Sequence, residues 1–265
     1  KKFSLMIFVC LLTGLPQTAA SQDDATNSMN IPADPMTQRP SEDESSVAEG
    51  SKIYRSSCIY CHGVEGAGDG PVAYFLSRDT GPHPRDFTTG IYKFRSTPSG
   101  YLPADEDIFR TISAGIKGFM PPFAGLSVSD RWKLVYYLKS LYPEFQDEDI
   151  EYLEVVGAPI PQTGASVARG YEVYQQFKCW ECHGGSGIGN GEKAADLRDD
   201  WGFLLPPQNL TMPSAFKNGR DPVDLYRTIM GGLDGGAMPS YADSFDGDEE
   251  DAWHLINYVN SISAE

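Results

Sequence analysis

The fold is decided by two short stretches, Cys58-Ile-Tyr-Cys61-His62 and Cys179-Trp-Glu-Cys182-His183. In each, two residues separate a pair of cysteines, and a histidine directly follows the second cysteine. The first cysteines of the two stretches lie 121 residues apart in a chain of 265 residues, which is long enough for two small domains with separate cores. The chemistry of the protein must therefore use the same five-residue pattern twice.

Cys-x-x-Cys-His is the attachment signature of haem c. The two thiols add across the two vinyl groups of the porphyrin, and the adjacent histidine is then held beneath the iron as its proximal ligand. A redox-active thiol pair, or half of a zinc site, would leave both histidines unexplained. The sequence predicts two covalently bound haem c groups. The predicted attachment residues are Cys58, Cys61, Cys179 and Cys182, and the predicted proximal iron ligands are His62 and His183.

The segments around the two motifs repeat each other. The matching pairs are 50–54 with 170–174, 107–112 with 224–229, 118–121 with 236–239, and 131–138 with 252–259. The offset between the pairs is nearly constant along the chain. The sequence therefore contains a duplicated domain, with boundaries that we predict at 46–141 and 166–265.

Each repeat also supplies a methionine that can be the sixth iron ligand. Met120 lies 58 residues after His62 and Met238 lies 55 residues after His183, and a proline follows each methionine. A thioether opposite a histidine gives the high-potential state used in electron transfer. The alternative is that these methionines fill core space, which would not explain their equivalent positions. Met212 has no counterpart in the first repeat, and a core position is predicted for Met230.

Periodicity and punctuation predict helices and no strand, so the fold class is all-α. In the first repeat we expect a helix from about Val47 to the first motif, one from Pro103 to Gly115, and one capped by Ser129 that runs to about Leu141. In the second repeat we expect helices before Cys179, from about Pro222, and from about Asp248 to Ile262. The remaining segments are rich in Gly and Pro, which is typical of loops.

Three further segments lie outside the repeats. Residues 1–20 have a basic start, an apolar run and a small-residue end, the pattern of an export signal. The apolar run is shorter than a membrane-spanning helix requires, so an uncleaved membrane anchor is the lesser alternative. Residues 21–45 are predicted to be a disordered acidic leader, and 142–165 an acidic linker. Together these features predict an exported, periplasmic protein.

The charge is strongly negative overall and unevenly distributed. The whole chain has a net charge of −16, which makes nucleic acid an unsuitable partner. The first repeat carries 11 basic and 9 acidic side chains, whereas the second carries 7 basic and 16 acidic ones. This asymmetry predicts a protein partner with a basic docking surface. With similar ligands on both irons, it also predicts a higher redox potential at the first haem, because nearby positive charge favours the reduced iron.

On these motifs, each repeat resembles a class I cytochrome c, and the resemblance covers 46–141 and 166–265. It implies three main helices wrapped around one haem in each domain. It also implies that a proline carbonyl accepts a hydrogen bond from Nδ1–H of the proximal histidine, for which the matching residues are Pro84 and Pro207. Arg85, Lys93 and Arg95 follow the first motif and are candidates to neutralise haem propionates, with solvated surface charge as the equal alternative.

The function that these features predict is electron transfer, not catalysis, by a dihaem carrier or by the cytochrome subunit of a larger exported oxidoreductase. The alternative is an enzyme, a dihaem cytochrome c peroxidase. A peroxidase needs an iron that opens to substrate, whereas here each iron has a candidate methionine and neither repeat has a large insertion. The first repeat is also similar to cytochromes that accompany respiratory molybdenum enzymes or terminal oxidases, which suggests a membrane-bound or molybdenum-enzyme complex as partner.

Overall fold

The computed structural model describes residues 38–75, 82–146 and 150–263, and within these ranges the fold is all-α, as predicted. The α-helices are α1 (Glu44–Ser57), α2 (Ile59–His62), α3 (Pro71–Phe75), α4 (Asp105–Ala114), α5 (Val128–Ser140), α6 (Gly164–Gln176), α7 (Trp180–His183), α8 (Pro222–Gly231) and α9 (Glu249–Ile262). Short 3-10 helices are Phe87–Thr89, Pro143–Gln146, Pro213–Ala215 and Ala242–Ser244. The predicted export signal, 1–20, lies outside the described residues.

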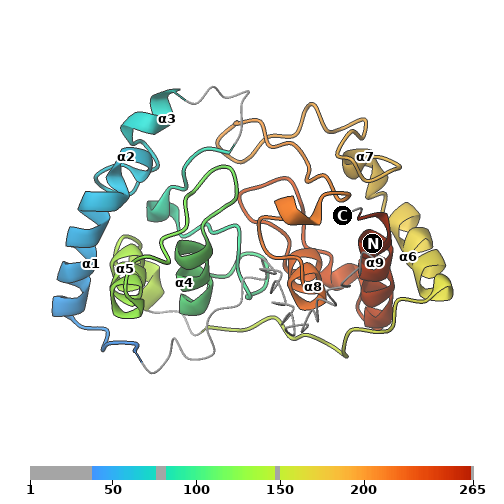
Figure 1. Cartoon of the computed structure of the whole chain (residues 1–265), viewed down its shortest axis with the longest axis horizontal. Coiled ribbons are helices and arrows are strands. Elements are labelled where there is room, and N and C mark those ends of the chain that lie inside the picture. Colours follow the sequence, from blue (N-terminus) through green and yellow to red (C-terminus); the bar gives the residue numbers. More distant parts are fainter. Residues whose placement is uncertain (1–37, 76–81, 147–149, 264–265) are drawn as a thin grey trace, which may run out of the picture.

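The two repeats form two domains that lie side by side (Figure 1). Helices α4 and α8 lie in the middle, whereas α1 and α6 lie at the opposite outer ends. In each domain the first long helix packs against the last one, α1 against α5 and α6 against α9. No helix among the described residues is both long enough and apolar enough to cross a membrane.

A glycine stands at each of these two helix crossings. A Cβ on Gly50 of α1 would lie 2.0 Å from the carbonyl oxygen of Lys133 on α5. A Cβ on Gly170 of α6 would lie equally close, 2.0 Å, to the carbonyl oxygen of His254 on α9. Both distances are far below van der Waals contact, so any side chain here would force the helices apart. Glycine therefore stands at positions 50 and 170 because both domains need the same close helix crossing.

Aromatic rings fill the space beside each crossing. Tyr54 lies 5.0 Å from Tyr137 between ring centroids, and the equivalent pair in the second domain, Tyr174 and Tyr258, lies at 5.2 Å. Both domains also bury a tryptophan of the last helix in a stacked ring pair. These pairs are Phe109 with Trp132 at 4.3 Å and Tyr226 with Trp253 at 4.6 Å. The two cores are thus built from the same contacts, and each is separate from the other.

Helix ends agree with the sequence in most places and differ in two. Helix α4 ends before Gly115 and α9 begins after Asp248, as expected. The cap of α5 is Ser127, whose hydroxyl accepts from the backbone N–H of Asp130 at 3.0 Å, so Ser129 was the wrong choice. Helix α1 begins at Glu44, three residues before Val47, because the Asp43 carboxylate accepts from a first-turn N–H and extends the helix.

The leader predicted at 21–45 is ordered at its end, which corrects the prediction for residues 38–45. Arg39 lies over the ring of Trp132, 4.3 Å from its centroid, and pairs with the carboxylates of Asp105 and Glu106. Lys139 pairs with Glu42 at 3.0 Å. Composition alone predicted disorder, but these charged groups find partners on α4 and α5. Residues 21–37 lie outside the described residues.

The segment predicted as an acidic linker contacts both domains. Phe145 is buried in the first core, and the N–H of Leu153 donates to the Ser96 carbonyl at 2.8 Å. Further along, the carbonyl of Val156 accepts from the indole N–H of Trp253 at 2.9 Å. These contacts fix the segment to both domains.

The glycine crossings give a prediction on stability with a control in the same helix. We expect Gly170→Ala to lower the free energy of unfolding by ~2 kcal/mol or more, because the new Cβ meets a backbone carbonyl that cannot move without shifting α9. Gly164 of α6 has nothing within 4 Å of a Cβ, so Gly164→Ala should change stability by less than ~0.5 kcal/mol. Denaturant unfolding of the two variants measures the difference, and equal effects would contradict the proposed crossing.

Candidate haem sites

Each Cys-x-x-Cys-His motif forms a single helical turn at the end of the first long helix of its domain. His62 is the last residue of α2 and His183 the last residue of α7. A tyrosine of the preceding long helix, α1 or α6, holds the end of each turn. The Tyr54 hydroxyl donates to the Gly63 carbonyl at 2.8 Å, and the Tyr174 hydroxyl donates to the Gly184 carbonyl at 2.6 Å. The same residues that pack the helices therefore also position the motif.

The two histidine rings are held in the orientation that an iron ligand needs. Nδ1 of His62 lies 3.0 Å from the carbonyl oxygen of Arg85, and Nδ1 of His183 lies 2.9 Å from that of Gln208. Because a carbonyl only accepts, each Nδ1 carries the proton and each Nε2 keeps its lone pair for a metal. Burial lowers the pKa of both histidines, which keeps the rings neutral. His62 also stacks on Phe87 at 4.5 Å.

These two hydrogen bonds correct the prediction for Pro84 and Pro207. In both domains the accepting carbonyl belongs to the residue after the proline. The Pro84 oxygen instead faces Gly68, 2.5 Å from where a Cβ would stand, and the Pro207 oxygen faces Gly189. Consecutive carbonyls of an extended segment point to opposite sides. The carbonyl of the residue after each proline therefore points to the histidine, and the proline carbonyl points away from it. Since the accepting group is backbone, the sequence carried no side-chain signal for it.

The four cysteines are unpaired thiols in the structure. Burial raises the pKa of Cys58 and of Cys179 to about 11, so both are protonated at neutral pH. A structural zinc site needs thiolates and further ligands. Within the described ranges, no group of three or more His, Cys, Asp and Glu side chains gathers to hold such an ion. The arrangement fits thioether attachment of a porphyrin better than it fits zinc.

The two candidate methionines lie half-buried on equivalent loops, which we call the Met loops, 116–120 and 233–238. The N–H of Ile116 donates to the Met120 carbonyl at 2.8 Å, and the N–H of Leu233 donates to the Met238 carbonyl at 3.0 Å. Each loop follows a glycine with positive φ that ends α4 or α8. The other two methionines of the second repeat do not share this setting, since Met212 is exposed and Met230 is buried in the core.

A cluster of cations lies where the two domains meet. Arg85 of the first domain lies over the ring of Trp201 of the second, 4.5 Å from its centroid. Burial lowers the pKa of Lys93 to about 8, helped by repulsion from Arg85 and from Lys217. Two backbone N–H groups of the second domain donate to Oδ1 of the nearby Asp199. The carboxylates of Asp199 and Asp200 act on Arg85 and Lys93, so the cluster combines three cations with two acidic groups.

Several buried polar atoms of the first domain lack a hydrogen-bond partner within the described residues. They are Arg85 Nη1, Tyr92 Oη, Thr97 Oγ1, Arg110 Nε and Arg131 Nε. Such orphan groups are rare in folded proteins, and Arg85 Nη1 is the one that belongs to the cation cluster. Haem propionates are carboxylates that would satisfy both these cations and the orphan Nη1 of Arg85. The residues present thus fit the haem. Arg95, the third candidate, instead pairs with Asp234 of the second domain at 2.8 Å, so its charge is already neutralised.

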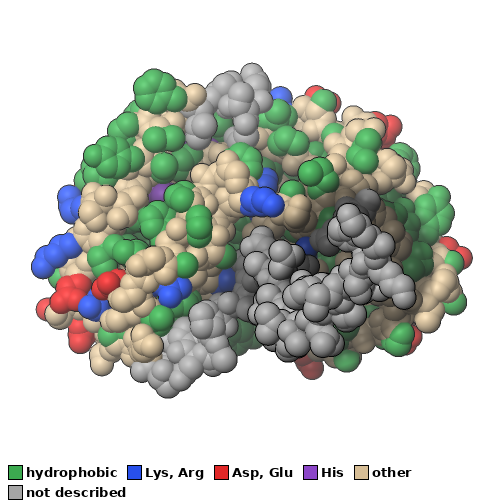
Figure 2. Space-filling model, viewed as in Figure 1, with side chains coloured by type: hydrophobic (Ala, Val, Ile, Leu, Met, Phe, Trp, Pro, Cys, Tyr) green, Lys and Arg blue, Asp and Glu red, His purple; other side chains and the backbone are tan. Residues whose placement is uncertain are grey.

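Sequence reasoning missed the contribution of the second domain to this cluster. Trp201 and Lys217 follow the second motif by 18 and 34 residues, and their contact with the first domain depends on how the domains pack. Lys and Arg side chains are visible near the middle of the molecule in the space-filling view (Figure 2). No periodicity or motif could have placed them there.

An all-α repeat with two such motifs defines the protein as a c-type cytochrome of two tandem domains. Residues 45–138 and 165–259 each match the family model described as cytochrome c oxidase, cbb3-type, subunit III. The chain belongs to this family, which carries covalently bound haem c and transfers electrons. No curated protein matches the chain.

A solved structure is also similar. It comes from Kuenenia stuttgartiensis and is described as the reducing HAO-like protein complex Kustc0457/Kustc0458. The similar chain is 39% identical, with a TM-score of 0.76, and the match covers 82% of the present chain and 96% of that one. The match therefore spans nearly all of that chain. The resemblance to a cytochrome c domain, expected from the motifs, is confirmed.

The cation cluster generates a prediction on redox potential. We expect Arg85→Gln to lower the midpoint potential of the first haem by on the order of 50 mV, because loss of positive charge stabilises the oxidised state. The backbone carbonyl that holds His62 is retained in this variant. Arg55→Gln, the same change at an exposed position on α1, is the control and should have a much smaller effect. A redox titration in which both variants shift equally would contradict the assignment.

Proposed function

We propose that this protein is an exported dihaem cytochrome whose irons are both ligated by histidine and methionine, His62 with Met120 and His183 with Met238. The observation that carries the proposal is the repeated pair of a half-buried, Nδ1-bonded histidine and a methionine on a closed loop. When bound, haem c supplies one-electron chemistry at the iron. The protein's residues orient the ligands, exclude water and set the surrounding charge.

The same observation argues against the peroxidase alternative. In a peroxidase only one of the two irons opens to substrate, which favours two Met loops of different structure. Instead, both loops place the methionine carbonyl on the N–H of the residue that follows the helix-ending glycine. We therefore propose a role in electron transfer.

We further propose that the chain acts as a subunit beside a redox partner. The similar structure is described as a reducing HAO-like protein complex of two proteins, and this supports a redox partner from such a complex. A membrane-bound or molybdenum-enzyme complex stays a prediction. The basic start and apolar run of 1–20 support export to the periplasm.

The acidic residues available for docking are those that the domain interface leaves free. Asp224 and Asp234 are engaged with Arg110 and Arg95 across the interface. Exposed acidic residues remain around the start of α9, namely Asp243, Asp246, Asp248 and Glu250. We propose that this acidic surface meets a basic surface of the partner.

Spectroscopy tests the ligation. We expect the oxidised protein to show two low-spin irons and the sulfur-to-iron charge-transfer band at the red end of the visible spectrum. Met120→His and Met238→His should each remove about half of that band, because each removes one thioether and keeps six ligands. Met212→His is the control and should leave the band intact, since Met212 is exposed. A high-spin haem with rapid peroxide turnover in the natural protein would favour the peroxidase instead.

Ionic strength tests the docking surface. We expect the association rate with the redox partner to fall as salt rises from low to physiological concentration, because exposed charges are screened beyond about 8–10 Å. Charge reversal by Asp246→Lys and Glu250→Lys should slow association further. The same reversal at the exposed Glu65 of the first domain is the control. A rate that is flat with salt would contradict the acidic docking surface.

A further inference from the structure

Each Met loop is contacted by the opposite domain at an equivalent residue. Lys117 and Asp234 each stand two residues after the glycine that ends α4 or α8, Gly115 or Gly232. Lys117 reaches the second domain, and Asp234 reaches the first. The two residues have opposite charges and very different surroundings, so the two loops are not held equally.

Asp234 is bound by three groups of the first domain. The Ser99 hydroxyl donates to Oδ1 at 2.8 Å, the Gly100 N–H donates to Oδ2 at 2.8 Å, and the Arg95 guanidinium pairs with Oδ1 at 2.8 Å. Both carboxylate oxygens are therefore engaged. Hydrogen bonds to a charged group are about twice as strong as neutral ones.

Arg95 is itself fixed within the first domain. Its Nε donates to the Pro98 carbonyl at 3.0 Å and its Nη1 to the Tyr92 carbonyl at 3.2 Å, and the side chain is 1% exposed. Its Nη2 also donates to the Gly231 carbonyl at the end of α8, at 2.7 Å. A buried guanidinium thus ties the end of α8 and Asp234 to one rigid point. Moving the loop away would leave this charge buried without its counter-ion.

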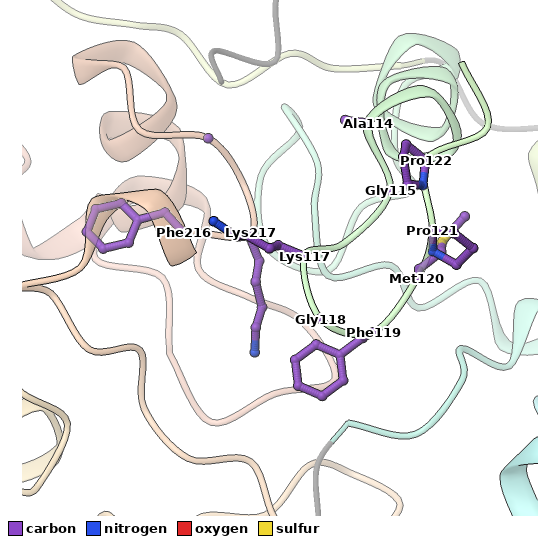
Figure 3. Close-up of a pocket in the computed structure, with 11 residues that line it drawn as sticks. Ala114, Gly115, Lys117, Gly118, Phe119, Met120, Pro121, Pro122, Phe216 and Lys217 are labelled. Atoms are coloured by element: carbon purple, nitrogen blue, oxygen red, sulfur yellow. The ribbon is translucent and has the colours of Figure 1, made fainter. Parts of the chain in front are cut away.

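Lys117 makes a weaker connection for the other loop. Its Nζ donates to the Ser214 carbonyl at 2.6 Å in an exposed position, and Phe119 is 51% exposed beneath the ammonium of Lys217, which lies 4.5 Å from its ring centroid. A cavity of about 520 Å³ borders this loop and is lined by Met120, Phe119 and Lys217, among others (Figure 3). The loop of Met120 therefore has space beside it and, among the residues that the structure describes, no buried ion pair.

We propose that Asp234 is a positioning residue, through which the first domain holds the Met loop 233–238 and keeps Met238 on the second iron. The inference rests on the proposed His/Met ligation. Opening this loop requires the Leu233–Met238 backbone bond and all three bonds to Asp234 to break together. Ligation at the second haem therefore depends on the domain interface more strongly than ligation at the first.

The test displaces methionine with imidazole in full-length, haem-loaded protein. In the Met120→His background the remaining sulfur-to-iron band reports only on Met238. There, Asp234→Ala should lower the imidazole concentration for half-displacement about tenfold, and the milder Ser99→Ala about threefold. Lys117→Ala is the matched control and should leave it unchanged. In the Met238→His background the order reverses, with an effect of Lys117→Ala that is smaller than tenfold.

The outcomes separate this proposal from the ligation on which it rests. Shifts of less than about twofold for both Asp234→Ala and Ser99→Ala, with far-UV circular dichroism unchanged, would overturn the role of Asp234. An equal shift caused by Lys117→Ala in the same background would also overturn it, because the effect would then be a general loosening of the interface.

Amide hydrogen exchange tests the role of Asp234 independently of the sulfur-to-iron band. The Leu233 amide, which closes the loop, should exchange faster in Asp234→Ala, whereas the Ile116 amide of the other loop should not change. If the band is absent already in Met120→His, the proposed ligation fails. The exchange of Leu233 then still decides whether Asp234 holds the loop, and unchanged exchange would count against it.

Discussion

The close crossing of the first and last helices is the constraint on which each domain depends. Gly50 and Gly170 let two helix backbones approach so nearly that a Cβ would strike a carbonyl oxygen at 2.0 Å. This approach brings Tyr54 against Tyr137 and Tyr174 against Tyr258. The same first tyrosine of each pair then donates to the glycine carbonyl at the end of the motif turn. One packing contact thus sets where the histidine stands, and the cofactor site follows from the core.

The two domains share the groups that build each haem site and differ in some of the groups at the interface between them. Groups that hold the histidine, close the Met loop and pack the core are the same in both domains. Groups that face the opposite domain are partly shared and partly diverged. Arg110 and Asp224, which pair across the interface, have Arg227 and Asp107 at the equivalent positions, whereas Lys117 stands where the second domain has Asp234. The change from Lys117 to Asp234 makes the two contacts between Met loop and opposite domain different in charge.

The sequence predicted most of what is local and little of what lies between domains. Motif spacing gave the two histidines and the Met loops, and helix punctuation gave α4, α8 and α9 to within a residue or two. The carbonyl partners were missed by one residue, because Arg85 and Gln208 act through their backbone. The cation cluster could not be foreseen, since Trp201 and Lys217 reach the first domain only through packing. Tertiary contact, which has no sequence period, decided these features.

The interface also changes the expectation for the two redox potentials. Counting charges by domain assigned Arg95 and Lys117 to the first haem and Asp234 to the second, which favoured a higher potential at the first. In the structure the buried Arg95 and the partly exposed Asp234 form one ion pair, and the Lys117 ammonium contacts the second domain. The fields of a close pair nearly cancel at a distance, so neither charge distinguishes the haems. The cations of Arg85, Lys93 and Lys217 remain, together with the carboxylates of Asp199 and Asp200, and they come from both domains. The difference between the two potentials therefore depends on how these charges are placed about the two haems and on the burial of each iron.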